Sequence, residues 1–312
     1  MTFAGLSKFM KESHLKYVYL IILSVIWGTS FILIKKALGQ DSSGNLTLQP
    51  LQLGALRTMI SGVILISIGW NSFSKTKRKD WPWLALSGLL GTFFPAFLFA
   101  YAQTEIDSAI SAILNSTVPL ITLILGAVLF GISFSRRQLL GVIIGLGGAV
   151  GLILAGMESN PEQNYLFVGL VLIACCCYAS NVNIIKRYLQ NIKPLAIATA
   201  NFVFILPLAI IVFLSADGAQ LEFTSNAVLT SLGYIVILCV FGTVAAKVMF
   251  NKLVQMTSPV FASSVTYLMP VIGLTWGTLD GETFTIWQGV ATGIIILAVI
   301  LVTRGKKEPA SK

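Results

Sequence analysis

Ten stretches of this sequence are almost continuously apolar, and each is about the length that a helix needs to cross roughly 30 Å of hydrocarbon. A membrane β-barrel is excluded because its strands alternate apolar and polar residues over roughly ten positions. Helices, in contrast, satisfy every backbone hydrogen bond within lipid. The sequence therefore predicts an all-α integral membrane protein with ten transmembrane helices. The expected spans are Tyr17–Leu38, Pro50–Trp70, Trp81–Tyr101, Ser108–Phe130, Gln138–Gly156, Tyr165–Arg187, Pro194–Leu214, Asn226–Phe250, Ser258–Leu279 and Phe284–Thr303.

The composition excludes a water-soluble protein. Of the 312 residues, 56% are hydrophobic and 11% are charged, whereas a soluble domain carries roughly 25% charged residues. The four cysteines all lie within apolar runs, three of them consecutively, so no disulfide framework is expected. The first apolar run is too long for the core of a signal peptide, so no cleavable leader is expected.

Charged residues alternate between successive connections. Lysines and arginines occupy the N-terminal tail, every second connection and the C-terminal tail. The other connections hold only acids. These acids are Asp41, Glu105, Asp107, Glu158, Glu162, Asp217, Glu222, Asp280 and Glu282. By the positive-inside rule both termini face the cytoplasm, so we expect a multi-pass membrane protein. The net charge of +9 thus reflects topology, and no nucleic acid partner is expected.

The two halves of the sequence repeat each other. A shift of 151 residues places Ile34-Lys35-Lys36 on Ile185-Lys186-Arg187 and Gly91-Thr92 on Gly242-Thr243, with Pro119 on Pro270. Residues 1–156 and 157–312 therefore form two units of five spans each. Because five is odd, the second unit is inverted in the membrane, which is typical of transporters that work by alternating access.

Three motifs resemble a known family. They are Trp27-Gly28-Thr29-Ser30-Phe31, the block Ala109–Pro119, and the block Phe261–Pro270 followed by Asp280-Gly281-Glu282. The whole chain resembles the EamA family of the drug/metabolite transporter superfamily. The resemblance implies ten helices in two inverted repeats and a central cavity lined mainly by spans 1, 3, 4, 6, 8 and 9. It also implies transport of small metabolites, often amino acids, mostly outward from bacterial cells, so the cytoplasmic (inner) membrane is the expected location. One departure is that Gly131-Ile132 lacks the acid found at Gly281-Glu282.

Two cations lie within predicted spans. Arg57 is seven residues into the second span, and Lys247 is near the cytoplasmic end of the eighth. A charge at such depth costs at least ~2.5 kcal/mol, so it is usually paired or faces a wet cavity. Either could bind a substrate anion, or could instead reach the headgroups. No Asp or Glu lies at mid-membrane in any span, which favours anionic or zwitterionic substrates over organic cations.

Polar and aromatic residues at matched positions of the two halves complete the candidate site. In span 4, Ser111 and Asn115 precede Pro119, and in span 9, Thr266 and Tyr267 precede Pro270. The two prolines are expected to break their helices, and polar groups beside a broken helix commonly bind transported solutes. The alternative is that the hydroxyls only join neighbouring helices.

Trp27 with Ser30, and Tyr178 with Asn181, are related by the same shift of 151 residues. These aromatic rings could stack on a substrate or could simply pack in the core. The predicted substrate-binding set is Trp27, Ser30, Arg57, Ser111, Asn115, Tyr178, Asn181, Lys247, Thr266 and Tyr267.

The function expected is export of small metabolites, such as amino acids or related anionic or zwitterionic solutes. The alternatives are a phosphate-linked sugar or nucleotide antiporter of the same superfamily, a multidrug efflux carrier, and a purely structural or sensor protein. An intramembrane enzyme is disfavoured because the single histidine, His14, lies in the tail. No catalytic residue, metal site or cofactor is expected. The expected partners are a small-molecule substrate and the lipid bilayer. The sequence does not decide between a monomer and a homodimer.

Overall fold

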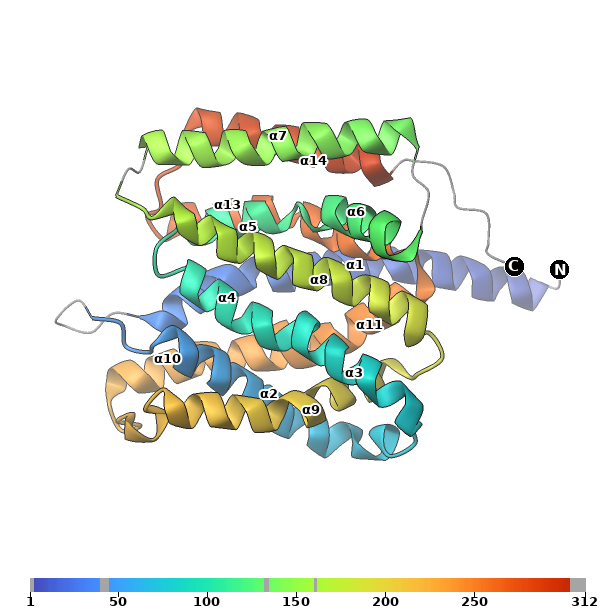
Figure 1. Cartoon of the computed structure of the whole chain (residues 1–312), viewed down its shortest axis with the longest axis horizontal. Helices are drawn as coiled ribbons and strands as arrows, with labels where there is room; N and C mark the ends of the chain where they lie inside the picture. Colours follow the sequence, from blue (N-terminus) through green and yellow to red (C-terminus); the bar gives the residue numbers. More distant parts are fainter. Residues whose placement is uncertain (1–2, 40–44, 132–134, 160–161, 304–312) are drawn as a thin grey trace.

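The structure is a computed structural model that describes residues 3–39, 45–131, 135–159 and 162–303 (Figure 1). Asp41, Ile132 and the tail from Arg304 onward lie outside the described residues, as do the side chains of Lys8, Lys11 and Glu158. Within this part of the chain the elements are helical and no strand occurs, as the sequence predicts. The α-helices are α1 (Phe3–Leu38), α2 (Pro50–Phe73), α3 (Trp81–Gly88), α4 (Phe94–Ala102), α5 (Ser108–Asn115), α6 (Val118–Phe130), α7 (Arg136–Ser159), α8 (Val168–Tyr188), α9 (Pro194–Ser215), α10 (Asn226–Ile237), α11 (Ala246–Met256), α12 (Pro259–Ser263), α13 (Met269–Leu279) and α14 (Ile286–Thr303).

Nine helical stretches of the described chain are long and apolar enough to cross a membrane. A tenth, Ile286–Leu301, is apolar but shorter. Several begin with proline at the first or second helical position, as at Pro50, Pro194 and Pro259. Proline is suited to this place because its fixed φ is helical and its missing N–H would have no partner there. The chain is therefore a helical membrane protein.

Four of the spans are irregular, and the irregular positions correspond between the two halves. The third span contains a π-helical segment, η2 (Leu89–Phe93), between α3 and α4. The eighth contains the π-helical segment η5 (Leu238–Ala245) between α10 and α11. The fourth is interrupted at Ser116 and Thr117, and the ninth passes through a 3₁₀ turn, η6 (Ser264–Tyr267). Such departures from α geometry are frequent at functional sites.

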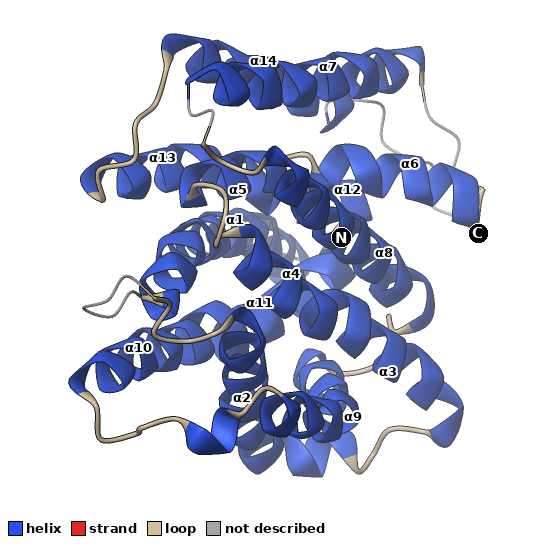
Figure 2. Cartoon of the chain, turned by 60° about the vertical axis from the view of Figure 1, so that its left-hand side comes forward, coloured by secondary structure: helices blue, strands red, loops and turns tan. Residues whose placement is uncertain are grey.

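The helices pack in layers, with one pair at each edge of the molecule. Helices α7 and α14 lie side by side at one edge, and α2 and α9 lie together at the other (Figures 1 and 2). Between these pairs, α1 packs on α13 and on α10 and α11, while α8 packs on α6 and on α3 and α4. Every contact of α1 named here thus has a counterpart made by α8.

Large apolar side chains cover much of the outer surface. Val128, Leu154, Ile211 and Trp287 are each at least 60% exposed. Patches of this kind would favour aggregation in water, but they match the hydrocarbon that surrounds a membrane protein.

Candidate functional site

A cavity of about 90 Å³ lies among the irregular spans. Its walls come from α1, α2, the two π-helical segments, α4, α5, α6, α8, α11 and the α12–α13 region. A hollow of this size has room for several water molecules, since one water needs about 10–15 Å³ by the same measure. The cavity brings together eight of the predicted residues. They are Trp27, Ser30, Arg57, Asn115, Tyr178, Asn181, Lys247 and Thr266.

Lys247 is held by neutral groups of the opposite half. The residue is 6% exposed, and its Nζ donates to the carbonyl oxygen of Gly91 and to Oγ1 of Thr92, both at 2.6 Å. Both acceptors belong to the π-helical segment η2. An ammonium has three donors, so two are satisfied here and a third remains for a ligand or water.

Arg57 contacts the other π-helical segment. Its Nε donates to Oγ1 of Thr243 at 3.2 Å, and that hydroxyl donates to the carbonyl oxygen of Leu238 at 3.3 Å. Arg57 lines the cavity together with Lys247, and no Asp or Glu is among the described residues that line it. The site is therefore a hollow with two cationic groups and no acidic residue in its lining.

Aromatic rings form much of the remaining wall. The indole Nε1 of Trp27 donates to the carbonyl oxygen of Gly242 at 2.9 Å, and its ring meets Phe250 edge-on at 4.9 Å between centroids. Phe99 packs edge-on against Phe31 at 5.4 Å and parallel to Tyr178 at 5.9 Å. These rings give the cavity apolar faces that would cover the body of a solute.

The polar neutral groups of the lining bond largely to the protein itself. Asn181 Oδ1 accepts from Ser87 Oγ at 2.6 Å. Asn115 Nδ2 donates to the sulfur of Met269 at 3.1 Å, and its Oδ1 accepts from Cys175 Sγ at 3.7 Å. The hydroxyls of Ser30 and Thr266 donate to backbone carbonyl oxygens of their own spans.

Two residues of the predicted set lie outside the cavity lining. Ser111 is fully buried within α5, and its hydroxyl has no hydrogen-bond partner among the described residues. Tyr267 donates from its hydroxyl to the carbonyl oxygen of Val299 on α14 at 3.2 Å. Thr266, the preceding residue of the same 3₁₀ turn η6, does line the cavity, so the two neighbouring side chains are directed to different sides.

Pro119 and Pro270 stand directly after the interruptions of spans 4 and 9. Each is the second residue of its helix, α6 or α13. They therefore begin new helices and do not kink continuous ones. Sequence reasoning missed Thr92 and Thr243, although both follow glycines that the repeat had aligned.

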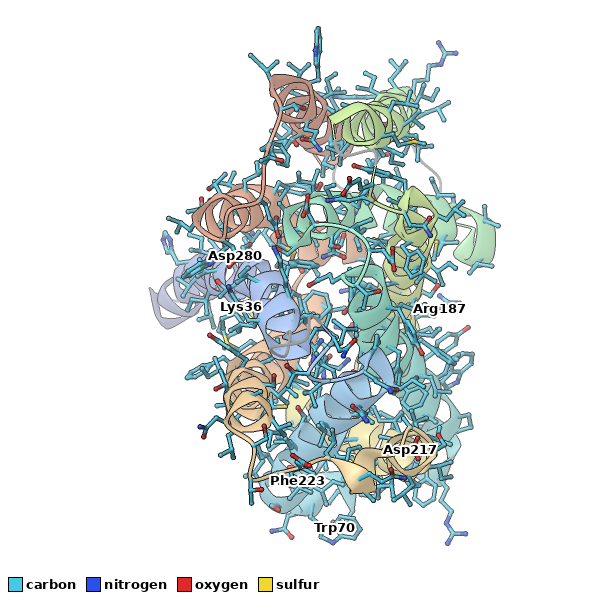
Figure 3. All side chains as sticks on the ribbon, turned by 90° about the vertical axis from the view of Figure 1, so that its left-hand side faces the viewer. Lys36, Trp70, Arg187, Asp217, Phe223 and Asp280 are labelled. Atoms are coloured by element: carbon cyan, nitrogen blue, oxygen red, sulfur yellow. The ribbon has the colours of Figure 1, made fainter. Side chains whose placement is uncertain are left out.

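Ion pairs and a helix cap lie where α1, α5 and the turn after α13 meet. We call Lys35, Lys36, Ser108, Asp280 and Glu282 the Glu282 cluster. Lys35 Nζ lies 2.8 Å from Glu282 Oε1 and 2.9 Å from Asp280 Oδ2, and Lys36 also pairs with Asp280 (Figure 3). Burial would raise the pKa of the Asp280 carboxyl, but hydrogen bonds from Lys36 and Lys35 outweigh it and hold that pKa below its ordinary value of 3.8.

Glu282 caps the first turn of α5. Its carboxylate accepts from the backbone N–H of Ser108 at 3.0 Å and of Ala109 at 3.1 Å, and from the Ser108 hydroxyl at 2.7 Å. A carboxylate at this position satisfies free N–H groups and interacts favourably with the helix dipole. The cluster fixes the cavity-lining helices α1 and α5 to the second half of the chain.

No group of three or more metal-ligating side chains occurs in the part of the chain that the structure describes. The architecture, a helical membrane bundle around a small hollow that contains two cationic side chains, is that of proteins that carry solutes across a membrane.

The comparisons with known proteins identify the family. The model of the EamA-like transporter family matches residues 14–154 and again residues 166–304. The chain therefore belongs to the EamA-like transporter family, and it is a membrane transporter.

Relatives and a solved structure agree with this assignment. YedA of Escherichia coli K12, described as an uncharacterized inner membrane transporter, is 28% identical over 92% of this chain and 90% of its own. A probable terminal-alkyne amino-acid exporter of Streptantibioticus cattleyicolor is 22% identical over 62% of this chain and 64% of its own. A protein of known crystal structure superposes with a TM-score of 0.64 at 16% identity, covering 92% of this chain and 96% of that one, which concerns the fold alone.

Proposed function

We propose that the chain is a carrier of small anionic or zwitterionic metabolites and works by alternating access. The observation that supports this function best is the cavity in which Arg57 and Lys247 are the charged groups. In the low-dielectric interior of a membrane protein, such cations are retained where they meet an anionic group or water. Release outward, across the inner membrane, is the direction we propose, and the amino-acid exporter among the relatives supports it.

The proposed architecture is ten spans in two inverted repeats, residues 1–156 and 157–312, with both termini in the cytoplasm. Three observations support it. The family model matches the two halves separately. The π-helical segments η2 and η5 occupy matched positions. The packing of α1 on α13 is matched by that of α8 on α6. The alternation of basic and acidic connections supports the orientation.

The cavity lies between the halves in this arrangement. Lys247 of the second half bonds to Gly91 of the first, and Trp27 of the first half bonds to Gly242 of the second. A relative movement of the two halves would therefore change the cavity walls directly, as alternating access requires.

A phosphate-linked antiporter is the second candidate. It is favoured by one observation, the presence of two cations in one cavity, because a phosphate dianion is well matched by two positive groups. Counterflow of labelled phosphate in vesicles loaded with phosphate would identify it.

The experiment that tests the proposed function is a metabolite-resolved flux assay. Proteoliposomes containing the full chain are loaded with a cell extract, and the solutes released are identified by mass spectrometry. We expect net release of specific solutes that Arg57→Gln and Lys247→Met reduce by at least roughly tenfold, which corresponds to about 1.4 kcal/mol. Release identical to that from empty liposomes would contradict the proposal.

A further inference from the structure

The cavity has cationic N–H donors without a protein acceptor among the described residues, whereas several of its oxygens already accept a hydrogen bond from the protein. The third proton of Lys247 and the terminal NH₂ groups of Arg57 have no protein acceptor in the described part of the chain. These are the donors that a carboxylate or phosphate accepts from. A solute that carries only acceptors at its charged end would therefore complete the site.

Several oxygens of the lining already accept a hydrogen bond from a protein donor. The carbonyl of Gly91 and the hydroxyl of Thr92 accept from Lys247, and the carbonyl of Gly242 accepts from Trp27. Asn181 Oδ1 accepts from Ser87, and Asn115 Oδ1 accepts from Cys175. An ammonium group carries three donors and no acceptor, so in this cavity it would have to share oxygens that already accept a hydrogen bond from the protein.

The acidic residues nearest to the cavity-lining helices already form ion pairs with lysines. Glu282 and Asp280, the acids joined to the cavity-lining helices α1 and α5, already pair with Lys35 and Lys36. A solute ammonium inside the cavity would meet two cations and no carboxylate. Both the Coulomb repulsion and the cost of removing the ammonium from water would oppose its entry.

The rest of the lining fits an apolar body. Phe31, Phe99 and Phe250 line the cavity beside Trp27 and Tyr178. Rings at these positions exclude water and contact aliphatic or aromatic carbon. The two cations are held in place from η2 and η5, and the rings line the same cavity, so one solute could contact both kinds of group.

We propose that the solute recognised in this cavity is an organic anion with an apolar body and no ammonium group, and that zwitterionic amino acids are discriminated against. This inference rests on the proposed function and narrows it, since that function admits both anions and zwitterions. Lys247 and Arg57 bind the anionic group, and the aromatic wall covers the body.

Four probes of nearly the same shape test the inference. They are 3-phenylpropionate, its neutral amide 3-phenylpropanamide, zwitterionic phenylalanine and cationic phenethylamine. Dissociation constants are measured by titration calorimetry on the purified full-length protein. We expect 3-phenylpropionate to bind at least roughly tenfold more tightly than each of the other three.

Variants assign the preference to the cavity cations. Lys247→Met should abolish the preference for 3-phenylpropionate over the amide, whereas Lys247→Arg should retain it because the charge remains. Lys252→Met is the matched control, because Lys252 is an exposed lysine five residues further along α11. If Lys247→Met does not fold, Arg57→Gln gives the same comparison.

The inference is overturned if phenylalanine or phenethylamine binds as tightly as 3-phenylpropionate, or if none of the four binds. It is also overturned if Lys247→Met and Arg57→Gln both leave the preference unchanged. The flux assay separates these results from failure of the proposed function. If solutes are released without any preference for anions, the protein is a transporter but the proposed substrate class is wrong. If no solute is released, the proposed transport function itself is contradicted.

Discussion

At the scale of single residues, the position of Lys247 depends on the absence of a side chain at residue 91. A Cβ built on Gly91 would lie 2.8 Å from Lys247 Nζ and would also press against the Asn181 amide. The ammonium reaches the Gly91 carbonyl only because that space is empty. A glycine that sequence comparison had aligned simply as a repeat position is thus required by the geometry of a buried cation.

Gly91→Ala is therefore expected to weaken anion binding by at least roughly tenfold, because the added methyl group displaces the Lys247 ammonium from the Gly91 carbonyl. Overpacking should also lower the free energy of unfolding by about 1–3 kcal/mol. Titration calorimetry with 3-phenylpropionate measures the first effect and thermal unfolding the second. Gly233→Ala in α10 is the control, since nothing lies within 4 Å of its added Cβ and a helical Gly→Ala change gains up to ~1 kcal/mol. Equal binding by the two variants would contradict this account of Gly91.

Two aspartates in the connections should respond to pH with opposite signs. Burial raises the pKa of Asp107 above its ordinary 3.8, although the hydrogen bond from Gln163 acts in the other direction. The folded state therefore binds a proton to Asp107 more tightly than the unfolded state does. The charged Asp107 carboxylate therefore lowers the free energy of unfolding at neutral pH. This destabilisation fades as the pH falls through the raised pKa and the carboxyl takes up a proton. Asp280 has the opposite effect, because its pKa in the folded protein is held below 3.8. Its charged carboxylate stabilises the folded state above pH 3.8, and this stabilisation is lost as the pH falls through the lowered pKa.

Asp107→Asn should consequently leave the protein as stable or more stable at about pH 8, with any gain fading towards about pH 4. Asp280→Asn should cost about 1–3 kcal/mol at both pH values, since it removes charge-assisted hydrogen bonds from Lys35 and Lys36. Thermal unfolding of the two variants across this pH range measures both effects. If Asp107→Asn loses more stability at about pH 8 than Asp280→Asn does, the opposite effects assigned to the two carboxylates are wrong.

The helical spacing of the sequence indicates which side chains share a face of a regular helix. Trp27, Ser30, Tyr178 and Asn181 lie on uninterrupted helices, so helical spacing places them correctly at the cavity. Ser111 and Tyr267 lie outside the lining, which the sequence could not indicate, because helical spacing does not show which neighbouring helix a side chain faces. That these residues bind a solute stays a prediction.

At the scale of elements, the irregular spans divide into those that the sequence signals and those that it does not. Proline at 119 and 270 indicates interruptions of spans 4 and 9, and the structure has them. Nothing in Leu89–Phe93 or Leu238–Ala245 distinguishes π from α geometry, because the same residues suit both. The Glu282 cluster was equally hidden, since Glu282 and Ser108 are 174 residues apart and only the tertiary fold joins them.

The N-terminal cap of α5 by Glu282 should stabilise the whole bundle. In Glu282→Gln, one end of the side chain would present an NH₂ group to a backbone N–H, either that of Ser108 or that of Ala109, and Lys35 would lose a buried partner. We expect a loss of about 2–4 kcal/mol in the free energy of unfolding. In a background with the more exposed Cys176 and Cys177 replaced by alanine, the reaction of a thiol-specific dye with the buried Cys175 and Cys239 on heating reports unfolding.

Glu105→Gln provides the matched control, because Glu105 is exposed and lies three residues before the helix that Glu282 caps. The same chemical change there should alter the unfolding temperature little. If both variants unfold at the wild-type temperature, the cap does not contribute to stability.

At the scale of the whole molecule, the two halves exchange equivalent contacts. Helix α2 packs on its counterpart α9, and α7 on its counterpart α14. The contacts of α1 with α10 and α11 are matched by those of α8 with α3 and α4. Such an exchange is expected of two similar units related by an approximate twofold axis. Because each unit has an odd number of proposed spans, that axis would lie in the plane of the membrane and would place equivalent loops on opposite faces.

The orientation of equivalent loops tests this arrangement directly. Lys77, between α2 and α3, and Ala219, between α9 and α10, are exposed residues of corresponding connections. With the four native cysteines replaced by alanine, a cysteine introduced at Ala219 should react with a membrane-impermeant maleimide on intact cells. A cysteine at Lys77 should react only after the membrane is permeabilised, because its loop carries the basic residues that stay in the cytoplasm. Modification of both positions from the same face would mean that the halves are parallel. The cavity between them could not then open alternately to the two sides by exchange of their conformations.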